Sequence, residues 1–311
     1  MPKILFFGDI MGKPGRKALA QVLPQLREQY HPDIVIANVE NLAHGKGVTL
    51  KTLEQLTALG VDVFTSGNHV FDKAPQAAEC FEKYPNLIRP ANYLSLAPAD
   101  SPKIDGRQVW DYKESSGFVP GVGYYRFAKN NPASPSASQG GQQYLIVNLG
   151  GQVFFEKQFS GVIGNPFFAL DEILQNQSQK DDIIIVDFHA EATSEKIALG
   201  WYADGRVTAL FGTHTHVPTA DWQLLPQTDI VKIDGRQNLQ YVTAYVTDVG
   251  MTGAKDSVIG VKVENALNAF LGKDKFRMDV AEDGPVMVNA LLVETDGVKA
   301  KNIERIYKEV S

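Results

Sequence analysis

The sequence has little cysteine and no long hydrophobic run. Cys80 is the only cysteine, which excludes an intramolecular disulfide and a cysteine-rich zinc site. No stretch reaches the roughly 20 apolar residues that a membrane-spanning helix needs. The apolar run at the N-terminus is too short for a signal peptide, and Asp9 follows it at once. We therefore expect a cytoplasmic protein with no membrane partner.

The sequence also lacks an excess of positive charge. Its 30 Lys and Arg residues stand against 36 Asp and Glu residues, a formal net charge of −6. A protein that grips long nucleic acid by its backbone normally carries a basic face. If the protein binds a phosphate-bearing ligand, groups other than a cluster of Lys and Arg side chains must hold the phosphate. The hydrophobic fraction of 44% and the charged fraction of 21% are those of a globular protein.

Short β-branched runs alternate with amphipathic segments through the first two thirds of the chain. The predicted strands are 4–7, 33–38, 61–65, 183–186 and 207–211, and the predicted helices are 15–29, 49–59 and 192–201. Pro24 predicts a kink or an early end in the first helix. Continuous apolar strands separated by helices indicate an α/β fold with a parallel sheet covered on both faces. Residues 286–294 and 299–307 predict an antiparallel completion of that sheet.

Three polar stretches interrupt this rhythm, at about 99–118, 129–142 and 227–240. The hexapeptide Lys-Ile-Asp-Gly-Arg-Gln occurs at 103–108 and again at 232–237. Asp-Gly between strand-like flanks is typical of a type I′ hairpin, so we expect surface β-arms there. Six residues are too few for a domain repeat. We predict a single domain over residues 1–311, a layered β-sheet core flanked by helices, with insertions at these three places.

Polar side chains follow directly after the apolar runs. In open α/β sheets, ligands bind beyond the carboxyl ends of the strands. Of the six histidines, four lie at such ends, while His31 and His44 lie in loops. The residues delivered to this rim are Asp9, Glu40, Asn41, Asn68, His69, His189, His214 and His216.

This set has the composition of a metal site without thiolates. If His214-Thr-His216 is extended, its imidazoles face the same side and suit adjacent metals. With Asp9, Glu40, Asn41, Asn68 and His189 they make seven oxygen and nitrogen ligands, more than one ion uses. Two ions sharing a carboxylate would use them well and would bring the positive charge that phosphate needs. Iron, manganese or zinc suits such ligands.

Several motifs in the sequence resemble those of a known enzyme family. Gly67-Asn68-His69 and Gly212-Thr-His214-Thr-His216 resemble those of calcineurin-like metallophosphoesterases. Longer strings resemble one bacterial branch, the YmdB-like 2′,3′-cyclic-nucleotide phosphodiesterases. They are 8–16, Glu40-Asn41, 187–196, 212–221 and 247–253. The resemblance covers almost the whole chain apart from the insertions, and it implies a calcineurin-like fold.

The resemblance also implies a role for each rim residue. One metal would be bound by Asp9, Glu40, Asn41 and His216, and the second by Glu40, Asn68, His189 and His214. Glu40 would bridge them, and a hydroxide between the metals would attack phosphorus. His69 would protonate the departing 2′ oxygen, so that a 2′,3′-cyclic nucleotide yields a 3′-nucleotide. The resemblance favours iron, self-association, and RNA ends as a further partner.

The sequence departs from the wider superfamily at two positions and from the branch at one. Met11 stands where the first motif has histidine, and Glu40 stands where aspartate is usual. The branch shares both changes. Val39 replaces the glycine that is usual before Glu40 within the branch, which bears on backbone fit and not on ligand identity.

Two other functions fit the same residues. One is a phosphomonoesterase or broader nuclease with the same metal pair, and the other is a regulatory protein that senses a nucleotide or RNA with little turnover. A P-loop is excluded because Pro14 stands where Ser or Thr must bind magnesium.

Each of three further residues has either a functional or a structural role. Asp187 either supports a ligand imidazole or is buried for structural reasons. His44 contacts substrate or is a solvated loop residue. Arg89 meets a phosphate or forms a surface salt bridge.

Overall fold

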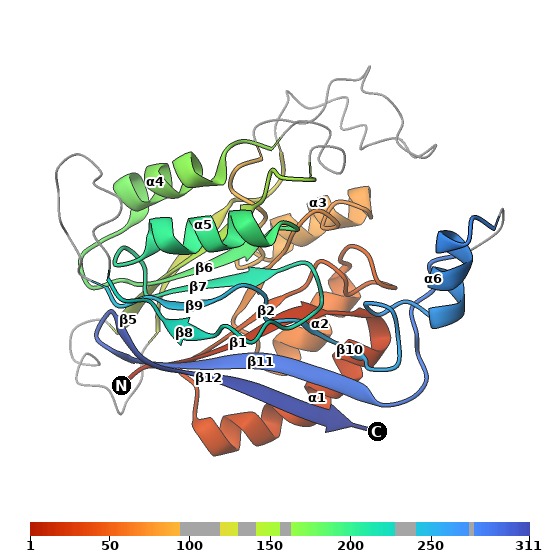
Figure 1. Cartoon of the computed structure of the whole chain (residues 1–311). Coiled ribbons are helices and arrows are strands. Elements are labelled where there is room, and N and C mark those ends of the chain that lie inside the picture. Colours follow the sequence, from red (N-terminus) through yellow and green to blue (C-terminus); the bar gives the residue numbers. More distant parts are fainter. Residues whose placement is uncertain (94–118, 130–140, 156–162, 228–240, 274–276) are drawn as a thin grey trace.

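Two β-sheets pack face to face, and helices cover their outer faces (Figure 1). The computed structural model describes residues 1–93, 119–129, 141–155, 163–227, 241–273 and 277–311. The layered α/β fold that the sequence predicted is confirmed. The single parallel sheet is wrong, because the predicted strands are divided between two mixed sheets.

The first sheet has six strands in the order β12-β11-β10-β1-β2-β3. They are β1 (Lys3–Ile10), β2 (Ile34–Asn38), β3 (Val63–Thr65), β10 (Met251–Ala254), β11 (Val286–Asp296) and β12 (Lys299–Val310). β1, β2 and β3 are parallel to one another. β11 and β12 pair antiparallel, which confirms the predicted antiparallel completion at the C-terminal end.

The second sheet has six strands in the order β4-β5-β6-β7-β9-β8. They are β4 (Tyr124–Lys129), β5 (Gln142–Gly150), β6 (Ile183–His189), β7 (Ala209–Thr213), β8 (Gln223–Leu224) and β9 (Ala244–Val246). β5, β6, β7 and β9 run parallel, and β4 and β8 pair antiparallel at the two edges.

Alternation along the buried strands explains the layers. In β1, Ile4 and Phe6 face the second sheet, where the Phe6 and Phe211 rings lie 4.9 Å apart. Leu5 and Phe7 face the opposite way, toward the helices. Because successive side chains point to opposite faces, a continuous apolar run serves two cores at once. One face of β1 is covered by the second sheet and the other by helices. The apolar sequence of the strand does not show which kind of element covers each face.

Five of the six helices in the described part of the chain pack on the two outer faces of the sheets. α1, α2 and α3 cover the first sheet, and α4 and α5 cover the second (Figure 1). The helices are α1 (Gly12–Tyr30), α2 (Leu50–Ala58), α3 (Ala74–Lys83), α4 (Pro166–Gln177), α5 (Thr193–Ala203) and α6 (Val263–Phe270). No helix in the described part of the chain is long and apolar enough to cross a membrane.

Helix α1 does not end at Pro24 but continues to Tyr30. A proline inside a helix costs about 3 kcal/mol. The buried side of the helix carries Leu19, Val22, Leu23 and Leu26, and each such side chain contributes about 1.5–3 kcal/mol on burial. Burial of these four side chains therefore stabilises the helix by more than the proline destabilises it.

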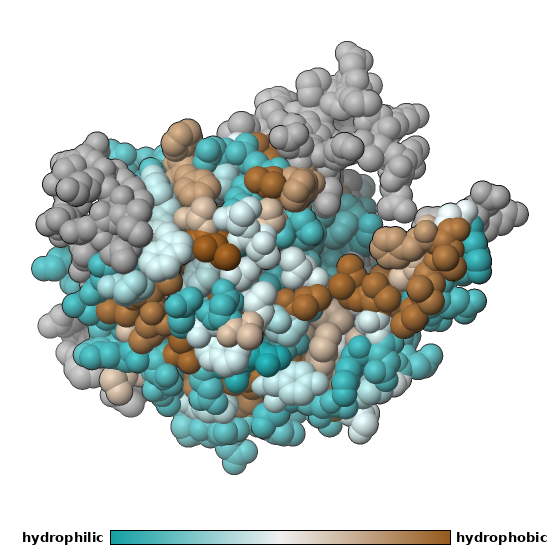
Figure 2. All heavy atoms as spheres, viewed as in Figure 1, coloured by the Kyte–Doolittle hydropathy of each residue, from teal (hydrophilic) through white to brown (hydrophobic). Residues whose placement is uncertain are grey.

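Helix α6 projects from the body, and its apolar side forms a hydrophobic surface (Figures 1 and 2). Phe270 is 86% exposed, and Leu267 and Leu271 are exposed beside it.

The predicted insertions and both β-arms lie largely outside the described residues. Lys129 and Gln142, at the ends of the insertion at 129–142, are paired with each other at the ends of β4 and β5.

Candidate metal centre

The carboxyl ends of strands from both sheets bring the predicted site residues together. Asp9 lies near the end of β1, and the residues after β2 and β3 join it from the same sheet. The second sheet contributes the last residue of β6 and the turn after β7. The side chains placed at this junction are Asp9, Glu40, Asn41, Asn68, His69, His189, His214 and His216.

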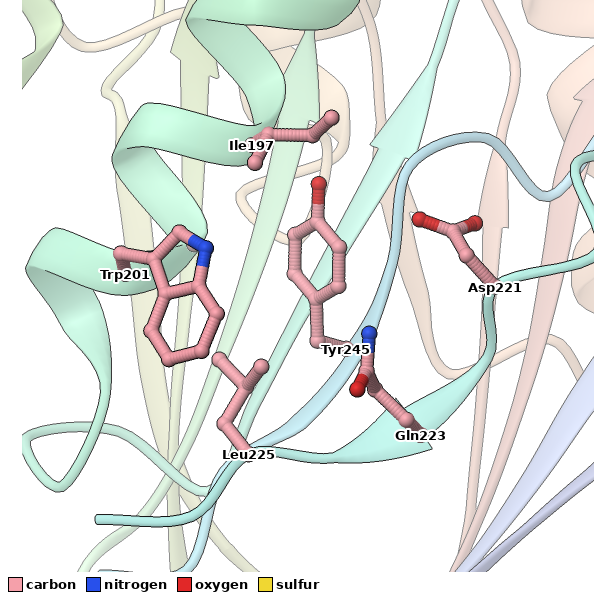
Figure 3. Close-up of a pocket in the computed structure, with 7 residues that line it drawn as sticks. Ile197, Trp201, Asp221, Gln223, Leu225 and Tyr245 are labelled. Atoms are coloured by element: carbon pink, nitrogen blue, oxygen red, sulfur yellow. The ribbon is translucent and has the colours of Figure 1, made fainter. Parts of the chain in front are cut away.

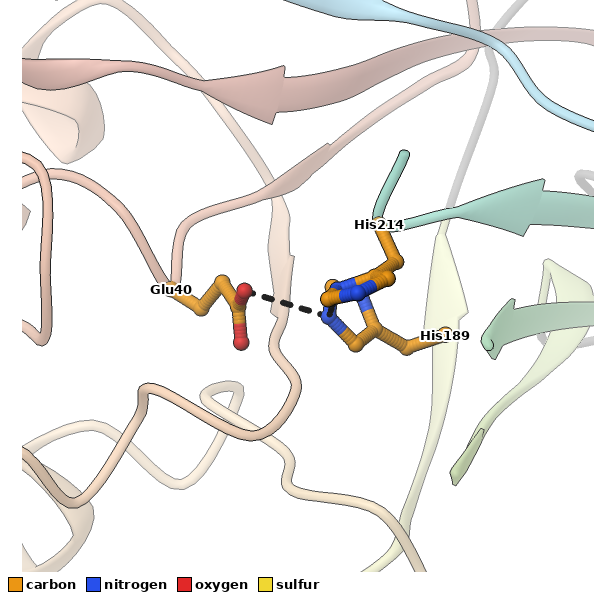
Figure 4. Close-up of side chains that lie close together, drawn as sticks. All are labelled: Glu40, His189 and His214. Atoms are coloured by element: carbon orange, nitrogen blue, oxygen red, sulfur yellow. Dashed lines mark hydrogen bonds and ion pairs between the residues drawn. The ribbon is translucent and has the colours of Figure 1, made fainter. Parts of the chain in front are cut away.

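Glu40, His189 and His214 form one cluster, in which one potential ligand atom from each lies within 4.8 Å of the others (Figure 4). The Nε2 atom of His189 is 3.1 Å from Glu40 Oε1 and 3.1 Å from His214 Nδ1. It is also 3.1 Å from Asn68 Oδ1. Carboxylate, amide and imidazole atoms converging on a buried point are the donor set that a first-row metal cation takes.

Asp9, Asn41 and His216 form a second group beside the first. His216 Nε2 lies 3.3 Å from Asn41 Oδ1 and 3.8 Å from Asp9 Oδ1. His216 Nδ1 donates to the carbonyl oxygen of Ile259 at 2.8 Å, which leaves the Nε2 lone pair directed at the two oxygens. Asp9 Oδ1 is buried and has no hydrogen-bond partner among the described residues. A cation fits this group, because it would satisfy lone pairs that no hydrogen-bond donor reaches.

The electrostatics of the first cluster favour positive charge at its centre. Burial alone would lower the pKa of His189, but the carboxylates of Glu40 and Asp9 outweigh burial and raise it to about 9. Burial alone would raise the pKa of Glu40, and the imidazole of His189 lowers it below its usual range. Burial and the neighbouring His189 lower the pKa of His214 to about 2. Glu40 is therefore an anion and His214 a neutral imidazole, the forms that bind metals.

A hydrogen-bond chain beneath the cluster orients His189. Thr213 Oγ1 donates to Asp187 Oδ1 at 2.7 Å and lies 2.9 Å from His189 Nδ1. Because the threonine hydroxyl gives its hydrogen to Asp187, it accepts from His189 Nδ1, and Nε2 faces the cluster. Asp187 also accepts from Asn38 Nδ2 at 3.0 Å and from the hydroxyl of Thr65. Asp187 thus supports the imidazole of His189 through the Thr213 hydroxyl.

The turn that carries His214 and His216 is not extended. Both residues have positive φ angles, 103° and 67°, a conformation that residues other than glycine rarely adopt. The premise that an extended segment turns both imidazoles the same way is therefore wrong. The turn directs His214 to Glu40 and His189, and it directs His216 to Asp9 and Asn41.

A buried ion pair holds this turn in place. Lys196 Nζ lies 2.6 Å from Asp248 Oδ2, and both side chains are almost completely buried. Asp248 Oδ2 also accepts from the backbone N–H of Thr215 at 3.2 Å. On the other side, the backbone N–H of His214 donates to Asp9 Oδ2 at 3.1 Å. These contacts fix the strained turn between the two sheets.

His69 lies beside the first cluster without entering it. Its backbone N–H donates to Glu40 Oε2 at 2.8 Å, and its Nδ1 lies 3.0 Å from Asp72 Oδ2. The carboxylate accepts from Nδ1, so the imidazole presents Nε2, and a quarter of the side chain is exposed. His69 is anchored next to the cluster and reaches solvent.

Gly67 is required by the close packing of the first cluster. A Cβ atom on Gly67 would lie 2.1 Å from His189 Cδ2 and 2.5 Å from Glu40 Oε2. The Gly67-Asn68-His69 motif therefore begins with glycine for a steric reason.

Several residues at the site were not identified from the sequence. Glu191 Oε2 lies 3.0 Å from His214 Nε2, and the Phe155 ring centroid lies 4.6 Å from that of His214. Asn38 and Thr213 directly precede predicted ligand segments, but no local pattern distinguishes them from other buried polar residues.

The two remaining sequence candidates lie in different settings. His44 is exposed in a loop with a φ of 59°. Both of its predicted roles, contact with substrate and a solvated loop residue, stay predictions. Arg89 donates to the backbone carbonyls of Pro90 at 2.8 Å and Pro120 at 3.1 Å. It forms no salt bridge with the residues that the structure describes.

Comparison with known proteins gives consistent matches along the chain. A family model described as YmdB-like protein matches residues 5–306. A protein of Bacillus subtilis strain 168 named 2′,3′-cyclic-nucleotide 2′-phosphodiesterase is 36% identical over 306 residues. That match covers 98% of this chain and 96% of the relative.

Solved structures show the same architecture. A structure described as a novel phosphatase from Mycoplasma pneumoniae superposes with a TM-score of 0.77 at 33% identity, covering 99% of this chain and 93% of the other. The calcineurin-like phosphoesterase YfkN from Bacillus subtilis superposes with a TM-score of 0.51 at 15% identity, covering 100% of this chain and 90% of the other. The second likeness supports the predicted calcineurin-like fold.

Proposed function

Because the chain belongs to the YmdB-like family and is a metallophosphoesterase, we propose that it hydrolyses 2′,3′-cyclic nucleotides to 3′-nucleotides. One observation carries the proposal. The Glu40 carboxylate and the imidazoles of His189 and His214 converge within 4.8 Å where the strand ends of two sheets meet. The name of the Bacillus relative supports the substrate class.

Two metal ions would be held by the two groups of side chains. Asp9, Asn41 and His216 would hold one ion, and Asn68, His189 and His214 the other, with Glu40 between them. When bound, such a pair supplies Lewis-acid activation of water and neutralises charge on the phosphate. The resemblance favours iron, with manganese or zinc as the alternatives, since all three suit mixed nitrogen and oxygen ligands.

His69 would deliver a proton to the departing 2′ oxygen. Its Nδ1 is occupied by Asp72, so Nε2 is the nitrogen available to substrate. Its backbone bond to Glu40 keeps the imidazole beside the cluster. General-acid catalysis of this kind accelerates a reaction by about 10²–10⁴.

A substrate panel tests the proposal. Metal-loaded protein should cleave 2′,3′-cyclic nucleotides in preference to 3′,5′-cyclic and linear substrates, and chromatography should identify 3′-nucleotides as products. Preference for linear esters would favour the phosphomonoesterase or nuclease instead. Binding of a cyclic nucleotide without product release would favour a sensing protein. Elemental analysis of freshly purified protein identifies the metal.

We also propose that the chain self-associates through α6. Phe270, Leu271 and Leu267 are 86%, 70% and 52% exposed on this projecting helix. Exposed apolar surface of this kind marks interaction sites. RNA ends remain a candidate partner and the cytoplasm the expected location, both on the sequence argument alone.

A further inference from the structure

A separate cavity opens between α5 and the strands β8 and β9 (Figure 3). Its volume is about 100 Å³, close to the scale of a single planar ring or a guanidinium group. None of the predicted metal ligands or His69 lines it. The side chains around it are Ile197, Trp201, Asp221, Gln223, Leu225 and Tyr245.

Two aromatic rings form one part of the cavity. Tyr245 lies between Trp201 and Asp221, as Figure 3 shows. The Tyr245 hydroxyl is 2.9 Å from Thr247 Oγ1, and its ring packs so closely against α5 that a Cβ atom on Gly200 would lie 2.4 Å from it. Trp201 is 36% exposed. The cavity therefore has one fixed ring and one ring that solvent reaches.

Asp221 provides a fixed carboxylate on the other side. Its Oδ1 accepts from Thr219 Oγ1 at 2.6 Å and from the backbone N–H of Thr247 at 3.2 Å. Among the residues that the structure describes, Thr247 alone donates to Oδ2, through its Oγ1 at 2.6 Å. Partial burial alone would raise the pKa of Asp221, but the bonds from Thr219 and Thr247 lower it. The group is thus an anion at neutral pH, and Oδ2 has room for another donor.

Nothing in the described part of the chain neutralises this carboxylate, which forms no ion pair with a described lysine or arginine. No basic side chain lines the cavity either. A phosphate-bearing ligand would meet negative charge here and find no cation to balance it. A ligand with positive charge and N–H donors meets a complementary site.

The exposed side chains that line the cavity from α5 are apolar. Ile197 is 42% exposed and Trp201 is 36% exposed. β8 is an edge strand of the second sheet, and Asp221, Gln223 and Leu225 in this segment line the cavity. Exposed tryptophan and isoleucine side chains that line a pocket are suited to a protein segment more than to a free metabolite, since interfaces are enriched in aromatic anchors.

We propose that this cavity is a docking site for an arginine side chain of a partner protein. The planar guanidinium group stacks on aromatic rings and donates to a carboxylate in the same plane. Trp201 supplies the exposed ring on which the guanidinium would stack, Tyr245 a buried ring in the wall of the cavity, Asp221 the carboxylate, and the Gln223 amide oxygen a further acceptor. The partner backbone would lie over the exposed side chains of Ile197 and Trp201 on α5.

Binding of a blocked tripeptide, acetyl-Gly-Arg-Gly-amide, tests the proposal by saturation-transfer NMR and calorimetry. The citrulline peptide has the same shape without the charge and is the matched ligand control. We expect saturable binding of the arginine peptide and at least tenfold weaker binding of the citrulline peptide. Trp201→Ala should weaken arginine binding about fivefold, as expected for loss of a cation–π contact.

Phe168→Ala is the matched protein control, since Phe168 is an exposed aromatic residue on α4 (71% exposed) that does not line the cavity. It should bind the peptide as the wild type does, and circular dichroism should show that both variants are folded. Equal binding of the arginine and citrulline peptides would overturn the proposal. So would binding of uridine 3′-monophosphate that is lost in Trp201→Ala, because it would make the cavity a nucleotide site. The assay needs no turnover, so its outcome is independent of the proposed hydrolase activity.

Discussion

Replacing Thr213 by valine should weaken metal binding although Thr213 is not a predicted ligand. Valine keeps the shape of threonine and removes the hydroxyl that joins His189 Nδ1, 2.9 Å away, to Asp187 Oδ1, 2.7 Å away. The imidazole then loses the contact that directs Nε2 toward Glu40. Loss of a partner that orients a ligand typically costs 10–100-fold in metal affinity, and we expect a loss in that range.

The same substitution should also reduce the free energy of unfolding. Thr213 is completely buried, so the His189 N–H and the Asp187 oxygen would lose their partner without access to water. An unsatisfied buried group costs about 1–3 kcal/mol, so the two together should cost about 2–6 kcal/mol. Urea unfolding measures this loss, and competition with a chelator followed by elemental analysis measures metal affinity.

Thr208→Val separates the two effects. Thr208 lies just before β7, at the end opposite Thr213, and its hydroxyl donates to Val298 O at 2.9 Å and accepts from Ile184 N–H at 3.1 Å. This variant loses buried hydrogen bonds of the same kind far from the imidazoles. It should be destabilised and bind metal normally. If Thr213→Val binds metal with an affinity within twofold of the wild type, the hydrogen bonds from Asp187 through Thr213 do not orient His189.

Four further substitutions test other parts of the site and surface. His69→Ala should retain both metals and lose about 10²–10⁴ in turnover; wild-type rates in a substrate assay would remove His69 from the proton-donor role. Gly67→Ala should lose metal in elemental analysis, because its Cβ would lie 2.1 Å from the imidazole of His189, a predicted ligand. Lys196→Met leaves Asp248 buried without its cation and should cost about 3–5 kcal/mol in urea unfolding, whereas an unchanged midpoint would contradict that assignment. Phe270→Glu should lower the molecular mass measured by light scattering if α6 joins copies of the chain, and an unchanged mass would exclude that surface.

Much of the fold could be predicted because its signals are local. The apolar run before Asp9 predicted a buried strand, and β1 is that strand. The helical spacing from Leu19 to Leu26 predicted a helix over 15–29, and α1 is that helix. The early end that Pro24 predicted as one alternative is wrong, because burial of that side outweighs the local effect of the proline. Division of the strands between two sheets was not predictable, since a run such as Ile4–Phe7 is equally apolar whether a helix or a sheet covers it.

The candidate site was likewise predictable where its signals are local and not where they depend on long-range contacts. Polar residues directly after buried strands predicted which side chains meet, because a strand end is defined by the run before it. The partners of those side chains depend on contacts across the fold. Thr213 meets Asp187 and His189 from a neighbouring strand, and Lys196 reaches Asp248 from α5. No spacing along the chain encodes such pairs.

The amino-acid sequence alone determined the buried strands, the acidic character and the nitrogen and oxygen side chains at the strand ends, because each is a property of neighbouring residues. The tertiary structure alone decided that two sheets face each other, that the turn after β7 sends His214 and His216 to different groups, and that Asp221, Tyr245 and Trp201 line one cavity. These features arise when segments far apart in the chain pack together, and the free energy of that packing resides in contacts between them.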